Sequence, residues 1–344
     1  MGTEYHRMIG VLHASVAVVH AAYIVWMIGW SYRKKDLVFA IYNVFKLPIN
    51  LEGVDGPNFD IVLLCREIVE TALQTQQAYL PAILTDFTQL KELKIYNSTI
   101  DKWDESAAIS HIVHPQLTTL FLVRVNLTNG ELPIGLHADV FPEALQDIEF
   151  CVTNLRTLPD DIDLKWPQYA SIYLEAGEFD EVPPSLVRLA PYDLSLSLNP
   201  ISTIPKELFE SESVAYLSFG GTLISELPEN VSEMASTVYD VNLSDTNISF
   251  FWPWIDSLAV IPAANPPITA GNTPYCDEVQ RILEKQQPNF YIPASALDNG
   301  TDSTSVLLDS SVNNWATLRN AVSCEVEDST YSPLNFEDEY SKIN

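Results

Sequence analysis

A short apolar phrase recurs seven times between Leu90 and Leu258, and this repeat constrains the fold more than any other feature. Its form is L-x-x-L-x-L-x-x-[N/T/S]-x-L, often continued by L-x-x-L-P. The second conserved apolar positions, spaced 27, 28, 24, 22, 23 and 24 residues apart, are Leu93, Leu120, Ile148, Ile172, Leu194, Leu217 and Val241. Units of this length stack into a solenoid, because each unit buries its apolar residues only against its neighbours.

The two clearest copies start at Leu194 and Leu217, and both end in a Leu/Ile-Pro pair. They resemble the leucine-rich repeat. The resemblance implies an α/β fold, a solenoid with a curved parallel sheet of about seven repeats over residues 90–258. It also implies a binding surface and no catalytic role.

The position that is usually Asn in this family, where a side-chain amide bonds neighbouring turns, varies along the chain. It is occupied by Ser98, Val125, Thr153, Gly177, Asn199, Thr222 and Thr246. Hydroxyl groups replace part of such a ladder of hydrogen bonds, but Val125 and Gly177 cannot. We therefore expect these two turns to be looser, or bonded through backbone and water.

An uncharged segment of 23 residues, 8–30, precedes the repeats. Its length matches the roughly 20 residues that span a bilayer as a helix, and Trp26, Trp30 and the basic run 33–35 form an interfacial edge after it. We predict a retained transmembrane helix within residues 1–36, and hence a single-pass membrane protein. A signal peptide ending near Ala21 is the alternative.

Two sequence signals disagree about the side of the membrane that carries the repeats. The basic run 33–35 favours the cytoplasm. Six glycosylation sequons favour the opposite side: Asn97, Asn126, Asn230, Asn242, Asn247 and Asn299. We expect an extracytoplasmic repeat domain, although Asn242 would project from a strand and is a poor glycan site.

The segments flanking the repeats are predicted to cover the open ends of the solenoid. Residues 37–89 form an N-terminal capping segment, with a helix that begins after Asp60. Residues 259–324 form a C-terminal cap, and residues 325–344 form an acidic tail. The family resemblance implies a disulfide-bonded C-terminal cap, for which Cys276 and Cys324 are the candidate pair; their pairing stays open because the cysteines are not clustered.

Two phrases outside the repeats carry a more specific resemblance: Cys65-Arg-Glu-Ile-Val-Glu70 before them and Gly271-Asn-Thr-Pro-Tyr-Cys276 after them. Both are similar to phrases in membrane-attached leucine-rich repeat proteins of the oomycete type. This resemblance implies a membrane protein without an assigned chemistry. Many such relatives have several membrane helices, so a truncated multipass protein is another alternative.

Composition and motifs argue against several classes of function. The net charge of −28, from 46 acidic and 18 basic residues, disfavours nucleic acids and anionic lipid surfaces as partners. No kinase loop, P-loop, GxSxG, HExxH or CxxC motif occurs in the sequence. His111 and His114 lack supporting acids, so we predict no enzyme activity, no metal and no cofactor.

The better candidate site is the concave face of the sheet, because strand side chains alternate between the core and the solvent. The predicted ligand-binding residues are Tyr96, Phe121, Arg124, Glu149, Tyr173, Glu175, Asp193, Tyr216 and Asp240, with Lys94 and Asp147 also pointing outward. Aromatic side chains flanked by acids are typical of protein and peptide sites. We therefore expect a receptor-like protein that binds a basic or mixed-charge protein or peptide, with a membrane-tethered cytoplasmic scaffold as the alternative.

Overall fold

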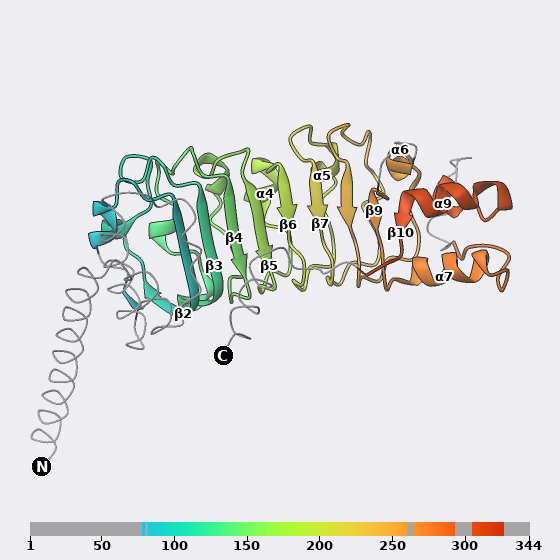
Figure 1. The fold of residues 1–344 in the computed structure, drawn as a ribbon, viewed down its shortest axis with the longest axis horizontal. Coiled ribbons are helices and arrows are strands. Elements are labelled where there is room, and N and C mark those ends of the chain that lie inside the picture. Colours follow the sequence, from blue (N-terminus) through green and yellow to red (C-terminus); the bar gives the residue numbers. More distant parts are fainter. Residues whose placement is uncertain (1–77, 80–81, 260–264, 293–304, 327–344) are drawn as a thin grey trace, which may run out of the picture. The chain divides into compact units, whose positions relative to one another are not determined.

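The computed structural model describes residues 78–79, 82–259, 265–292 and 305–326, all of which belong to the larger of two compact units, Asn58–Ile343. A single parallel sheet of ten strands in chain order dominates these residues (Figure 1). The strands are β1 (Ala78–Tyr79), β2 (Glu92–Lys102), β3 (Thr119–Leu127), β4 (Asp147–Cys151), β5 (Ser171–Glu175), β6 (Asp193–Ser195), β7 (Tyr216–Ser218), β8 (Asp240–Asn242), β9 (Ile268–Thr269) and β10 (Val322–Ser323). Strands β2 to β8 are the seven that the repeat predicts, so the α/β solenoid is confirmed.

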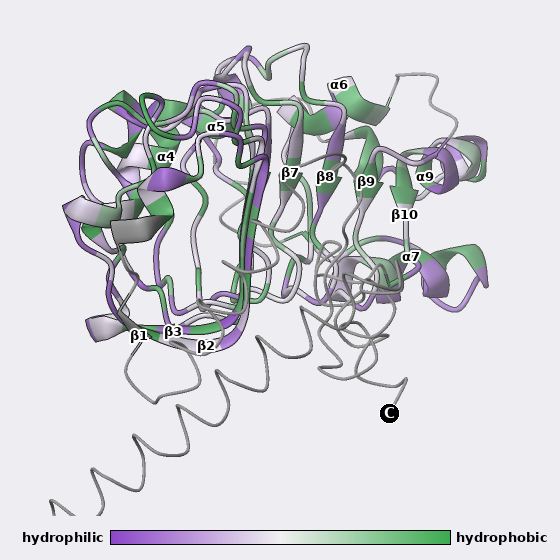
Figure 2. Ribbon diagram, turned by 60° about the vertical axis from the view of Figure 1, so that its left-hand side comes forward, coloured by the Kyte–Doolittle hydropathy of each residue, from purple (hydrophilic) through white to green (hydrophobic). Residues whose placement is uncertain are grey.

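Short helices form the segments that return from one strand to the next, and Figure 2 shows the sheet and these segments as two layers. They are η1 (Ala82–Asp86), η2 (Glu105–Ala107), η3 (Thr128–Gly130), η4 (Ile134–Leu136), η5 (Ile162–Leu164), α4 (Pro184–Leu189), α5 (Glu207–Glu210), η6 (Pro253–Ile255) and α6 (Asp256–Ala259). Proline sets the start of several of them; Pro184 and Pro253 are first helical residues, where a missing N–H costs no hydrogen bond.

The core lies between the two layers, and the predicted inward positions fill it. Each of the seven is buried: Ile95, Leu122, Phe150, Leu174, Leu196, Phe219 and Leu243. Phe179 and Phe209 pack from the return segments into the same cluster. Each coil thus closes its apolar face on the next coil, as a stacked repeat requires.

A residue with positive φ lies within, or up to three residues after, each of the strands β2 to β9. These residues are Asn97, Arg124, Val152, Ala176, Leu198, Gly221, Asp245 and Asn272. Gly221 is the glycine among them, and a Cβ at this position would lie 2.4 Å from Leu198 Cδ2. The recurrence of this turn explains why the strand pattern restarts in the same register in every coil.

Hydroxyl groups replace asparagine in the turns as expected. Asn199 Nδ2 donates to the Leu174 and Leu196 carbonyls at 2.7 and 2.9 Å, and Asn199 Oδ1 accepts from Phe179 N–H. A threonine hydroxyl instead donates to the carbonyl three residues before it in its own coil, at 2.7 Å each, from Thr222, Thr246 and Thr273. The ladder therefore survives with fewer bonds between coils.

The two turns that lack a hydrogen-bonding side chain are stabilised in different ways. Val125 is buried in the extension of β3, where backbone pairing with β2 continues through Ser98. Gly177 has a packing role, because a Cβ there would lie 2.9 Å from Asn199 Oδ1. The expected backbone bonding is thus seen at Val125, and Gly177 makes room for the asparagine of the next coil.

Beyond β8 the sheet continues into the C-terminal segment. Strand β9 pairs with β8 and β10 pairs with β9. The other elements here are α7 (Pro274–Leu283), η7 (Val306–Leu308), η8 (Val312–Asn314) and α9 (Trp315–Ala321). Cys276 and Cys324 form a disulfide with a Cα–Cα distance of 5.6 Å, which ties α7 to the end of β10.

The N-terminal predictions fall largely outside the residues that the structure describes. This holds for the segment 8–30 and for the helix predicted after Asp60. At the N-terminal edge, β1 pairs in parallel with β2, and His114 Nε2 lies 2.9 Å from the Leu84 carbonyl of η1. Among the described residues, no helix has the length and apolar character needed to cross a membrane.

Candidate functional site

Side chains of the sheet that point away from the core form three rows across the strands, which together we call the outer face. The first row is Glu92, Thr119, Asp147, Ser171, Asp193, Tyr216 and Asp240. The second is Lys94, Phe121, Glu149, Tyr173, Ser195, Ser218, Asn242 and Thr269. The third includes Tyr96, Val123, Cys151 and Glu175. Because coil stacking aligns the rows, residues 22 to 28 positions apart in the sequence become lateral neighbours.

The centre of the outer face is a buried acidic cluster on β4, β5 and β6. Glu175 accepts a hydrogen bond of 2.5 Å from Ser195 Oγ and one of 3.7 Å from Cys151 Sγ. Glu149 is 6% exposed, and its Oε2 accepts no hydrogen bond from the residues described. A buried oxygen without a donor is costly, so Glu149 has an unmet hydrogen-bonding capacity.

Electrostatic repulsion adds to the cost of burying these carboxyl groups. Burial, followed by the charges of Asp147 and Glu175, raises the pKa of Glu149 to about 8, and Lys94 opposes this only in part. Burial and the neighbouring Asp193 charge also raise the pKa of Asp147. The cluster is therefore short of positive charge.

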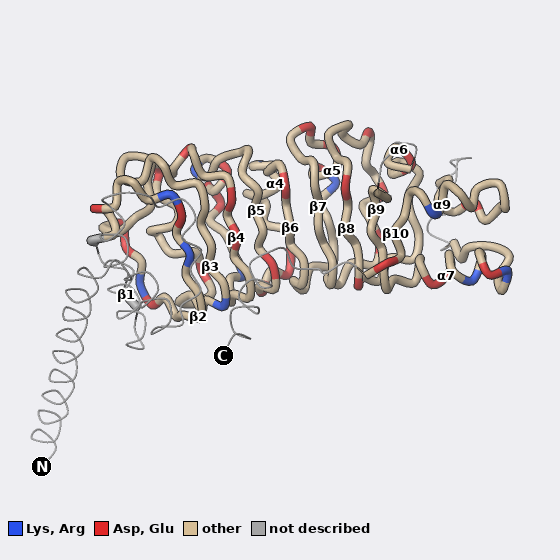
Figure 3. Tube along the Cα trace, in the orientation of Figure 1, with Lys and Arg blue, Asp and Glu red and all other residues tan. Residues whose placement is uncertain are grey.

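One end of the outer face is already neutralised. Lys94 Nζ lies 2.7 Å from Glu92 Oε2 and 4.9 Å from the centre of the Phe121 ring. Basic residues are few elsewhere along the strands, whereas acidic positions recur (Figure 3). The acidic positions of the outer face thus lie mainly from β4 onward.

Hydroxyl groups continue the second row towards β8. The Ser197 and Ser218 hydroxyls are 2.7 Å apart and share a hydrogen bond. Asn242, also buried, accepts from the Ser244 N–H at 2.9 Å. The Asn242 side chain is therefore buried and hydrogen-bonded within the sheet, whereas other sequon asparagines are exposed.

The structure brings together six of the predicted residues and separates others from them. Glu149, Tyr173, Glu175 and Asp193 are contiguous on β4 to β6, with Tyr216 and Asp240 following in the first row. Tyr96 and Phe121 lie beside Lys94 at the neutralised end. Arg124 lies within β3 but has a positive φ, so its side chain does not follow the strand alternation.

The prediction that the outward side chains are exposed to solvent is wrong at the centre of this face. Tyr173, Glu149, Glu175 and the thiol of Cys151 point outward but are buried, because side chains of both adjacent strands flank each of them. Cys151 is therefore no surface thiol, and burial raises its pKa. The alternation of the strands predicts that Ser195 points outward, but the other hydroxyl partner, Ser171, was not singled out by sequence; its only signal is its place opposite an acid in the repeat.

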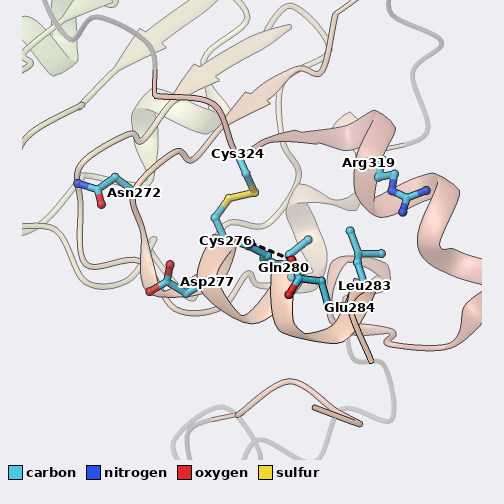
Figure 4. A pocket seen from close by; sticks show the side chains of 9 residues that line it. Asn272, Cys276, Asp277, Gln280, Leu283, Glu284, Arg319 and Cys324 are labelled. Atoms are coloured by element: carbon cyan, nitrogen blue, oxygen red, sulfur yellow. Dashed lines mark hydrogen bonds between the residues drawn. A yellow bond between two sulfur atoms is a disulfide. The ribbon is translucent and has the colours of Figure 1, made fainter. Parts of the chain in front are cut away.

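A hollow of about 450 Å³ lies between α7 and α9 beside the disulfide (Figure 4). Its lining mixes Val279 and Leu283 with charged groups, among them Glu284 and Arg319. Gln280 Nε2 donates to Glu284 Oε1 at 3.0 Å across one side. The hollow is open and lacks convergent unsatisfied polar groups, so the outer face remains the better candidate site.

The histidines and acids of the described residues do not assemble a metal site. No group of three or more His, Cys, Asp or Glu side chains there has the geometry to hold an ion. His114 is buried against the Leu84 carbonyl, and desolvation lowers its pKa. Its role is structural, at the junction of η1 with the first coil.

Comparisons with known proteins find leucine-rich repeat proteins among solved structures. A Leptospira interrogans LRR protein aligns with 18% identity over 62% of this chain and 63% of its own, at a TM-score of 0.39. The octameric complex of Latrophilin 3, Unc5D and FLRT2 (LRR) aligns at 14% over 64% and 81%, with a TM-score of 0.42. A Shigella effector LRR domain aligns at 16% over 72% and 91%, with a TM-score of 0.33. The chain spans less than two thirds of the Leptospira protein, and no family model or curated protein matches it.

Proposed function

We propose that this chain is a non-enzymatic binding protein whose outer face takes a protein or peptide of basic or mixed charge. The observation that carries the proposal is the buried acidic cluster at the centre of that face, which lacks a hydrogen-bond donor. Glu149 keeps a buried oxygen without a donor beside Asp147 and Glu175. A cationic group from a partner supplies the missing donor and favours the ionised form of this carboxyl group.

The rest of the outer face supports the same role. Tyr216 and Phe121 offer partly exposed aromatic area at either side of the acidic centre. Aromatic anchors near charged groups give binding energy together with specificity.

The experiment compares two charge reversals in affinity capture with the full chain. Asp193→Lys changes the outer face, and Asp180→Lys makes the same change at an exposed position in the segment after β5. A protein captured by the wild-type chain is then purified and its binding measured directly. We expect at least a tenfold loss with Asp193→Lys and none with Asp180→Lys; equal binding by both variants contradicts the proposal.

We further propose membrane attachment through residues 8–30, with the repeat domain on the extracytoplasmic side. The Cys276–Cys324 disulfide supports this side, because disulfides persist in oxidising compartments. Four exposed sequon asparagines also support it: Asn97, Asn126, Asn230 and Asn247. The resemblance to membrane-attached oomycete-type proteins fits the same arrangement.

A membrane-tethered cytoplasmic scaffold is the second candidate, favoured by the basic run 33–35. Treatment of the cellular protein with a glycosidase distinguishes the two. A shift to lower apparent mass supports the extracytoplasmic side, whereas an unchanged mass together with reduced cysteines supports the scaffold.

A further inference from the structure

The second and third rows of the outer face carry only small, uncharged residues from β6 to β9. We call these positions the small-residue band: Ser195, Ser197, Ser218, Gly220, Asn242, Ser244, Thr269 and Gly271. All of them are buried although they lie on the outward side of the sheet. The Ser244 hydroxyl is buried without a hydrogen-bond partner among the described residues. A backbone that lies on the band supplies such a partner.

The chain leaves the last strand by way of this band. Strand β10 ends at Ser323, and the backbone of Glu325 and Val326 fills the space where a Cβ of Gly271 would lie. That missing side chain would point to the outer face, in line with Ser244 on the neighbouring strand. The acidic tail, residues 325–344, therefore starts on the outward side of the sheet.

The charge pattern of the tail matches the charge pattern of the strands. Within the described strands, basic residues occur only in β2 and β3, namely Lys94, Lys102 and Arg124. The tail has an uncharged stretch, residues 329–336, and then three consecutive acids, residues 337–339. An uncharged stretch avoids repulsion by the acidic cluster on β4 to β6, and the three acids suit the end of the face that holds the basic residues.

The length of the tail fits the same arrangement. Strand β2 lies seven strand spacings from β9, or about 34 Å at about 4.8 Å for each spacing. An extended chain covers about 3.3 Å per residue, so about ten residues after Val326 bridge this distance. Residues 337–339 then arrive at β2, while the uncharged stretch 329–336 covers the strands between.

We propose that the acidic tail folds back across the outer face from β9 towards β2, with residues 329–336 over the small-residue band and the acidic cluster and residues 337–339 beside Lys94. Lys94 keeps its ion pair with Glu92, which the acids of the tail extend to a network. In this position the tail covers the surface that the proposed function assigns to a basic partner, so the contact is autoinhibitory. The inference goes beyond the proposed function, because the contact forms and is measured without a partner.

Two photoreactive probes in the full chain test the path of the tail. Benzoylphenylalanine is introduced at Tyr331 in one protein and at Phe336 in the other, and the cross-linked peptides are identified by mass spectrometry. Position 331 lies about 16 Å of extended chain beyond Val326, and position 336 about 33 Å. We expect the first probe to cross-link to strands β5 to β7 and the second to β2 and β3. Cross-links of both probes to one region, to the return segments, only between chains, or to nothing would overturn the inference.

Matched charge neutralisations test the register. Glu337→Gln combined with Glu339→Gln should lower the cross-link yield of the Phe336 probe about threefold, as expected for the loss of exposed ion pairs. Asp180→Asn combined with Glu181→Gln, the same change in the exposed segment after β5, should leave the yield unchanged. Equal yields for the two variants would contradict the register. Partner binding that depends on Asp193, without any cross-link of the tail to the strands, would leave the proposed function standing and remove only this inference.

Discussion

Replacement of Glu149 by glutamine tests, without any ligand, whether ionisation of this buried carboxyl group destabilises the fold. In the folded chain the pKa of Glu149 is raised from its ordinary value of 4.5 to about 8 by burial and by the charges of Asp147 and Glu175. The folded state therefore binds one more proton than the unfolded chain between these two pH values. Stability from this group is complete below pH 4.5 and is lost as the pH rises through 8.

The structure sets the size of the effect. Between pH 4.5 and 8, each pH unit lowers the free energy of unfolding of the wild type by about 1.4 kcal/mol. The stability lost relative to low pH is therefore about 3 kcal/mol at pH 7 and about 5 kcal/mol above pH 8. Glutamine mimics the protonated acid and does not titrate. Glu149→Gln should thus gain stability relative to the wild type as the pH rises, whatever constant offset the amide introduces.

Urea denaturation followed by tryptophan fluorescence between pH 5 and 9 measures this difference. Glu181→Gln, the same change at an exposed position, is the reference and should alter stability little at any pH. A difference between Glu149→Gln and the wild type that stays constant across this range would refute the electrostatic account of the outer face.

Three further predictions concern the frame that carries this face. Serine at both Cys276 and Cys324 should destabilise the C-terminal segment by about 4 kcal/mol, as expected for a bridge across 48 residues, and hydrogen exchange of α7 should report it. Asn199→Ala should cost about 2 to 4 kcal/mol in thermal or urea unfolding, because it leaves buried backbone groups unpaired, whereas Asn199→Thr should cost about half as much; equal losses would contradict the ladder. In cells that glycosylate the chain, Asn242→Gln should leave the mass unchanged because Asn242 is buried, while a loss of mass is expected on replacing any one of the exposed asparagines Asn97, Asn126, Asn230 and Asn247.

The repeat pattern was sufficient to predict the seven central strands and their inward residues. Positions such as Leu196 and Phe219 recur at a fixed offset within each unit, and burial of an apolar side chain against the next coil leaves one register for each strand. The alternation of strand side chains then places Asp193 and Glu149 on the opposite face. Neither step requires knowledge of contacts between distant residues.

The state of those outward residues could not be predicted in the same way. Whether Glu149 is exposed depends on what stands beside it on β3 and β5, and that depends on how coils of unequal length align. The return segments absorb the length differences, so the strands stay in register while their spacing in the sequence varies. The same alignment places Ser195 against Glu175 and leaves Cys151 buried.

Local periodicity and composition are enough to predict the kind of fold, the direction of most strand side chains and the excess of acids over bases. The stacked coils are needed to see that Asp147, Asp193 and Asp240 stand on alternate strands of one row, and that Glu149 lacks a donor beside them. Lateral distance, burial and pKa are properties of neighbouring coils, and a repeat specifies its neighbours only when the coils are stacked.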